Sequence, residues 1–183
     1  MSQLPFAIST KSWLDLNENE KRFFEDESCL HPSQIEHIQL LKPAAARRFT
    51  TWAFSSIPSG FPDYDGGYPN KCKISIHDSW NDETSIQKIR EWLHSLGIPL
   101  ARDVHLIYDF DCVVQTKWNV VVRYWEKFAW SVGYAMTCID HTLRWACCFH
   151  HEDVIVFESY FPLTLAQLTT SLPVSLLLLL LAQ

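Results

Sequence analysis

The sequence predicts an α+β fold, with N-terminal helices packed on a mainly antiparallel sheet from the C-terminal half. Two observations carry this prediction. Helix-compatible segments dominate the first third of the chain, and residues 104–158 hold short runs dense in aromatic and β-branched side chains. With 183 residues, 48% hydrophobic and 20% charged, the chain fits one globular domain. We expect that domain to span residues 1–160, followed by an uncharged, apolar tail over residues 161–183.

Three helices are expected in the first third of the chain. Residues 13–24 carry helix-compatible charges, and Pro32 suits the first turn of a short helix over residues 33–41. Pro43 can begin a third helix that reaches Ala53.

The middle of the chain alternates strand and helix signals. Residues 60–69 are rich in Gly and Pro and interrupt regular structure, and residues 71–77 then alternate like a half-buried strand. Asn81 or Asp82 can cap the next helix, and Gly97 suits its C-terminal end. A buried strand is expected from Val104 to Asp109.

Residues 116–129 carry conflicting signals for helix and strand. The run Val120-Val121-Val122 favours a strand. The apolar residues from Trp118 to Ala129 nevertheless recur at the spacing of one helical face, so we predict a helix. If residues 117–128 formed a strand instead, the order of the sheet would change. Strands are expected after this segment, over residues 133–139, 143–150 and 154–158.

Charge and cysteine usage indicate a cytoplasmic protein that does not bind nucleic acid. The formal net charge is −6, whereas nucleic-acid binding needs a basic face over the phosphates. The six cysteines form no CxxC pair, and residues 1–13 lack a basic region followed by an apolar run. Buried, reduced thiols are therefore expected.

The last residues, Leu176 to Leu181, raise the alternative of a membrane-seeking tail. A spanning helix needs about 20 mostly apolar residues, and Pro162 and Pro173 interrupt this stretch. A docked or frayed end, or a tail foreign to the native design, remains the other interpretation.

One short string imitates a catalytic signature. The apolar run from Val104 to Tyr108 leads into Asp109-Phe110-Asp111, which resembles the first motif of haloacid-dehalogenase-type phosphatases. The resemblance implies a Mg²⁺-dependent reaction, with Asp109 as nucleophile and Asp111 as acid/base. That family also needs a later Ser or Thr, a Lys and a further acidic pair on another parallel strand. The only later candidates for that pair, Asp140, Glu152 and Asp153, do not lie where it should, so we favour a strand that ends at solvent.

A metal site is a second alternative. His150 and His151, with His141, Glu152, Asp153 and Cys138, offer ligands for zinc or manganese. Adjacent residues of a strand point to opposite faces, however, which separates His150 from His151. We therefore expect no metal. The chain also has only five glycines and lacks the glycine motifs that bind phosphate groups, so we expect no nucleotide or other cofactor either.

A recognition surface is the third candidate. Phe61, Tyr64, Asp65 and Tyr68 lie in the Gly- and Pro-rich loop, where aromatic rings can stay exposed and contact a partner. The competing interpretation is that these rings fold back over the edge of the core.

Residues 116–128, together with Trp-Ala-Cys-Cys-Phe-His-His at 145–151 before an acidic turn, resemble small uncharacterised bacterial proteins, some of the toxin-immunity type. The resemblance implies a cytoplasmic protein that works by binding, and no catalytic residue is carried over from it. We therefore expect a non-enzymatic protein-binding module, in its most concrete form an immunity-type inhibitor whose acidic surface meets a basic toxin. The partner and the oligomeric state are left open.

Overall fold

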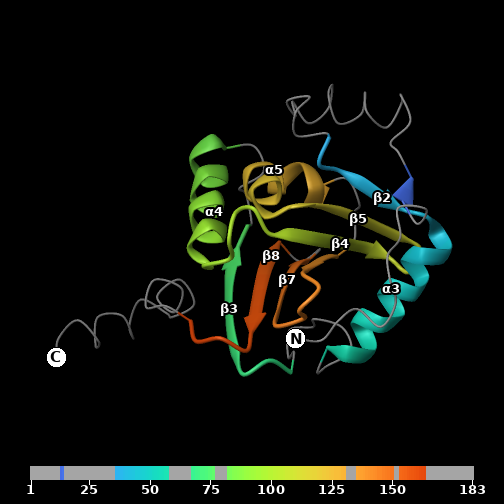
Figure 1. The fold of residues 1–183 in the computed structure, drawn as a ribbon. Helices are drawn as coiled ribbons and strands as arrows, with labels where there is room; N and C mark the ends of the chain where they lie inside the picture. The colour runs from blue at the N-terminus through green and yellow to red at the C-terminus, as the bar shows by residue number, and fades with distance from the viewer. Residues whose placement is uncertain are drawn as a thin grey trace, which may run out of the picture.

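An antiparallel sheet with helices on both faces forms the fold, which confirms the α+β prediction (Figure 1). The computed structural model describes residues 13–14, 36–57, 67–76, 82–130, 135–150 and 153–163. Within these residues the sheet has eight strands in the order β1-β2-β5-β4-β6-β7-β8-β3, and every neighbouring pair is antiparallel. The strands are β1 (Trp13–Leu14), β2 (Gln39–Leu41), β3 (Asn70–Ser75), β4 (Asp103–Asp109), β5 (Cys112–Lys117), β6 (Met136–Ile139), β7 (Trp145–His150) and β8 (Val154–Ser159).

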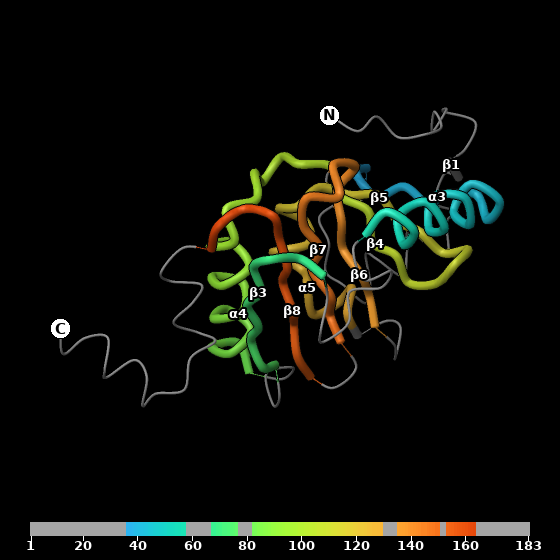
Figure 2. The backbone as a smooth tube through the Cα atoms, turned by 90° about the horizontal axis from the view of Figure 1, so that it is seen from below, coloured from blue at the N-terminus to red at the C-terminus, as the bar shows by residue number. Residues whose placement is uncertain are grey.

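The helices are divided between the two faces of the sheet. One face packs against α3 (Pro43–Ser56). The other packs against α4 (Glu83–Ser95) and α5 (Trp118–Trp130). Figure 2 shows α3 and α4 on opposite sides of the strands.

The larger half of the core lies under α4 and α5. Trp118 and Trp125 are fully buried there. The ring of Trp118 packs edge-on against Trp145 of β7 at 5.6 Å between centroids, and Trp145 in turn contacts Phe157 of β8 at 6.1 Å. Aromatic side chains bury more area than any others, so this row ties α5 to two strands.

The smaller half of the core lies under α3. Ala45, Ala46 and Ala53 are buried, and these small side chains let the helix approach the sheet closely. Phe49 fills the interface and packs its ring on His105 of β4 at 4.4 Å. Opposite faces of β4 therefore serve the two halves of the core.

The predicted signals at the ends of α4 are confirmed. The side chain of Asp82 accepts a hydrogen bond from the backbone N–H of Ser85 at 2.9 Å, and hydrogen bonding to the side chain and the backbone of Ser85 lowers the pKa of Asp82. Gly97 follows the C-cap Leu96 with φ +73°, a left-handed conformation that favours glycine.

Two expected N-terminal helices need correction. Trp13–Leu14 and Gln39–Leu41 are strands, which pair with each other and continue the sheet at β5. Backbone hydrogen bonds to a neighbouring strand outweigh weak helix propensity in such short segments. The remaining residues of both expected helices, up to residue 35, lie outside the described residues.

The other expected elements are confirmed with small shifts at their ends, and β5 is an additional strand that the sequence did not predict. The strands after residue 70 and the helix from Pro43 are present, and α5 is helical. Thr116 and Lys117, which the sequence assigned to that helix, belong to β5 instead because they pair with β4. Within α5, Tyr124 departs from helical geometry at φ −126° and ψ 27°. None of the described helices has the length and apolar character needed to cross a membrane.

Candidate functional site

The turn between β4 and β5 presents the most exposed large hydrophobic side chain of the described residues. Asp109 and Cys112 are paired across the two strands, so Phe110 and Asp111 alone form the turn. The backbone N–H of Phe110 donates to Asp109 Oδ1 at 2.6 Å. Phe110 itself is 58% exposed.

Helix α3 supports this turn from one side. Phe54 meets the ring of Phe110 edge-on, with 6.0 Å between centroids and an interplanar angle of 87°. Arg47 donates from Nη2 to Asp111 Oδ2 at 3.2 Å, across side chains that are both well exposed. An exposed ion pair adds only about 0–1 kcal/mol, so its main effect is to orient the turn. We call Phe110, its flanking residues Asp109 and Asp111, and the supporting Phe54 and Arg47 the hairpin tip.

The geometry of the hairpin tip does not match a phosphatase. That hypothesis requires both carboxylates in one pocket at the end of a parallel strand, but β4 is antiparallel to both β5 and β6. The two side chains are also engaged locally, Asp109 with the turn amide and Asp111 with Arg47. The strand ends at solvent, as the simpler interpretation of the Asp-Phe-Asp string expects.

The predicted recognition loop is described only at its end. Phe61, Tyr64 and Asp65 lie outside the described residues. Tyr68 is 5% exposed and belongs to the core under α3. Its hydroxyl donates to the carbonyl of Leu143 at 2.9 Å, and burial raises the pKa of that hydroxyl well above its usual value. The exposed ring next to Tyr68 is that of Tyr160, and the centroids of the two rings are 4.9 Å apart.

The predicted metal ligands are not brought together where they are described. Cys138 of β6 lies opposite Cys147 of β7 in the sheet, and both side chains face the core under α4 and α5 as free thiols. His150, three residues after Cys147 in β7, points to the opposite face. His151 and Glu152 lie outside the described residues, and no group of three His, Cys, Asp or Glu side chains in the described part could hold a metal ion.

The sequence contains one signal for the hairpin tip. An aromatic residue between two aspartates, directly after a buried strand, is a turn residue that cannot easily turn inward. The contribution of Phe54 and Arg47, in contrast, depends on how α3 lies against the sheet. That placement is not encoded in any local pattern.

No protein-family model matches the chain, and neither a curated protein nor a solved structure matches it significantly.

Proposed function

We propose that this protein is a non-enzymatic protein-binding module and that the hairpin tip is its main contact. The observation that carries the proposal is the 58% exposed Phe110, which a two-residue turn and the ring of Phe54 hold away from the core. Hydrophobic side chains scattered singly are common on surfaces, but aromatic residues fixed in place are typical of binding hot spots. A turn of two residues also loses little conformational entropy on binding.

The chemistry of the tip indicates the chemistry of its partner. Asp109 and Asp111 flank the exposed ring, and the whole chain carries a net charge of −6. An apolar pocket rimmed by lysine or arginine side chains would complement both features. A toxin with a basic active site is one protein of this kind, and we propose an immunity-type inhibitor as the most concrete form of the function.

The tip alone is too small for tight binding. Complete burial of a Phe side chain contributes about 1.5–3 kcal/mol, and part of Phe110 is already buried. Stable complexes bury roughly 800 Å² on each partner. The exposed face of α3 next to the tip would supply the remaining area: Ala44, Thr51 and Ser55 are exposed there, and the charge of Arg47 is paired with Asp111.

The test compares capture of binding proteins from the native cells by three tagged chains: wild type, Phe110→Ala and Leu100→Ala. Leu100 is a matched control because it is an exposed hydrophobic residue, 42% exposed, in the connection between α4 and β4. We expect one near-stoichiometric protein to bind the wild type and the control and to be lost with Phe110→Ala.

The captured protein is then purified and titrated against the same three chains. We expect Phe110→Ala to weaken its affinity about tenfold or more, and added salt to slow its association. A partner that binds Phe110→Ala as tightly as wild type would refute the contact site. The absence of any stoichiometric partner would refute the proposed function.

A further inference from the structure

A groove between α4 and α5 lies on the face of the sheet opposite α3. Its volume is about 330 Å³, near the lower end of the 300–1,000 Å³ typical of small-molecule sites. We call it the α4–α5 groove. Its lining residues are Gln87, Arg90, Glu91, His94, Val122 and Arg123.

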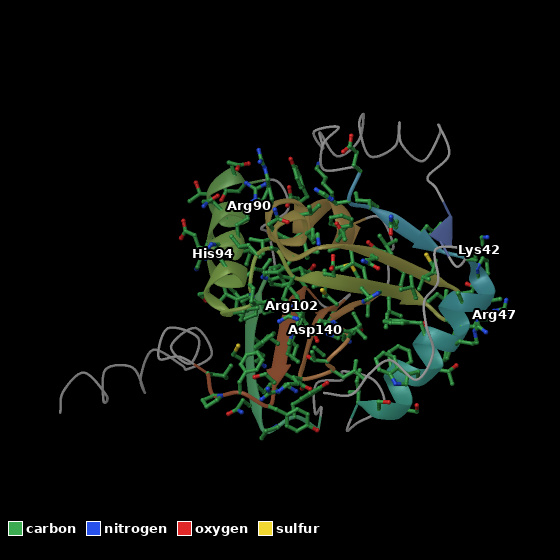
Figure 3. All side chains as sticks on the ribbon, viewed as in Figure 1. Lys42, Arg47, Arg90, His94, Arg102 and Asp140 are labelled. Atoms are coloured by element: carbon green, nitrogen blue, oxygen red, sulfur yellow. The ribbon has the colours of Figure 1, made fainter. Side chains whose placement is uncertain are left out.

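Arg90 forms a fixed wall of the groove. Its guanidinium donates to Glu83 at 2.9 Å and to Glu126 of α5 at 3.1 Å. The side chains of Arg90 and Glu126 are 23% and 10% exposed, so the ion pair is largely shielded from water. Figure 3 shows Arg90 and His94 on α4, with Arg90 beside α5. Because two carboxylates balance its charge, Arg90 contributes shape and hydrogen-bond donors more than net charge.

Arg123 contributes the uncompensated charge. It is exposed, and its guanidinium carbon lies 5.4 Å from the ring centroid of Tyr124. Within the described residues no carboxylate lies within ion-pairing distance of it. Contact with an aromatic ring leaves the edge of a guanidinium free to bind a carboxylate or phosphate through two parallel hydrogen bonds.

The remaining polar residues of the lining are Gln87, Glu91 and His94. Glu91 is the only carboxylate that lines the groove, and Gln87 donates a hydrogen bond to it at 3.2 Å. Since Glu83 and Glu126 balance Arg90, Arg123 is the one guanidinium of the lining without a carboxylate partner among the described residues, and His94 is a further polar side chain there.

We infer that the α4–α5 groove binds a small oxyanion, through a carboxylate or phosphate group that Arg123 contacts directly. Val122 gives the groove an apolar surface against which the carbon skeleton of such a molecule can pack. This site is separate from the hairpin tip, so it can be occupied whether or not a protein partner is bound.

The test is an NMR titration of the full chain with inorganic phosphate and, separately, with citrate. We expect saturable shifts of the backbone amides of Gln87, His94 and Arg123 with at least one of them. The probe that binds more tightly identifies the phosphate or the carboxylate class. We expect Arg123→Gln to weaken that binding about tenfold, because a charge-assisted hydrogen-bond pair is lost.

Lys127→Gln is the matched control, since Lys127 is an exposed cation on the same helix that does not line the groove. It removes the same charge and should change the affinity less than twofold. Equal weakening by both substitutions would show general charge attraction and overturn the proposal, as would shifts confined to other parts of the surface or no saturable shift. Phe110→Ala should bind the oxyanion as the wild type does, which keeps this result distinct from the proposed function.

Discussion

His105 is a titratable side chain held between α3 and the sheet. It is 4% exposed, with the ring of Phe49 packed on it. Burial lowers the pKa of His105 from 6.5 to about 4. Asp103 and Asp140 oppose this lowering, and His141 adds to it. The imidazole is therefore neutral in the folded protein at neutral pH.

This burial predicts a loss of stability in mild acid. The pKa is lower in the folded protein than in the unfolded chain, so the unfolded chain binds the proton first as the pH falls. The contribution of His105 to the free energy of unfolding is complete above about pH 6.5 and is lost on acidification towards pH 4. This loss amounts to about 3 kcal/mol. Urea unfolding at pH 7.5, 5.5 and 4.5 should show this loss in wild type and in the exposed control His37→Gln, and much less of it in His105→Leu. Equal pH dependence in all three proteins would contradict the prediction.

The cysteines differ in their access to solvent, which predicts selective labelling. Cys72, Cys138, Cys147 and Cys148 are buried free thiols, and burial raises the pKa of Cys72 to about 12. Cys112, at the start of β5, is partly exposed. Thiolates are the reactive form, so iodoacetamide should label Cys112 in the native protein and leave those four unmodified for much longer.

Peptide mass spectrometry would measure the labelling, with urea-unfolded protein as the control in which every cysteine reacts. Cys112 should still react more slowly than an ordinary thiol, because burial, Asp111 and Asp109 all raise its pKa. Early native-state labelling of Cys138 would contradict the burial of β6.

At the scale of single elements, the left-handed backbone conformation of Gly97 determines how α4 ends. Gly97 has φ +73°, and a Cβ added there would meet no atom within 4 Å. Gly97→Ala should therefore lose about 1 kcal/mol through left-handed backbone strain and not through a clash. Gly97→Asn is the comparison, since Asn tolerates this conformation and should cost less. Denaturant unfolding measures both, and an Ala variant as stable as wild type would exclude the strain.

The contact between α4 and α5 predicts an asymmetric response to substitution. Replacing Arg90 alone leaves Glu126 charged and largely buried, which should cost about 3 kcal/mol. Arg90→Leu combined with Glu126→Leu removes the stranded charge and should be more stable than Arg90→Leu alone. A double-mutant cycle in urea measures the difference. Additive losses would show that the ion pair carries no coupling energy.

Elements were predictable where a repeated pattern runs along the chain. The spacing of apolar residues in α4 and its flanking Asp82 and Gly97 were sufficient for that helix. The strand β5 was not predicted, because Thr116 and Lys117 at its end run directly into the helical pattern of α5. The strands β1 and β2 have two and three residues, too few to show an alternating pattern.

At the scale of the whole molecule, strand order and surface composition depend on contacts between distant residues. In sequence β3 precedes β4, yet it lies at the end of the sheet next to β8. The groove likewise combines Arg90 of α4 with Arg123 of α5, and no local pattern relates them. The sequence thus predicted most kinds of element and the buried strand at β4, while both candidate sites required the packed structure.

The central position of β4 leads to a prediction for the stability of the whole fold. This strand pairs with β5 on one side and β6 on the other, and Leu106 points from its middle into the core under α4 and α5. Leu106 is fully buried, so Leu106→Ala should leave a cavity that neighbours on two strands and two helices cannot fill. We expect a loss of about 3 kcal/mol in the free energy of unfolding.

Leu100→Ala makes the same chemical change at a position 42% exposed and should cost about 0.5 kcal/mol or less. Equilibrium unfolding in urea compares the two variants directly. A similar loss for both would mean that Leu106 does not lie at the centre of the core. Such a result would contradict the burial of Leu106 under α4 and α5 and the central place of β4 between β5 and β6.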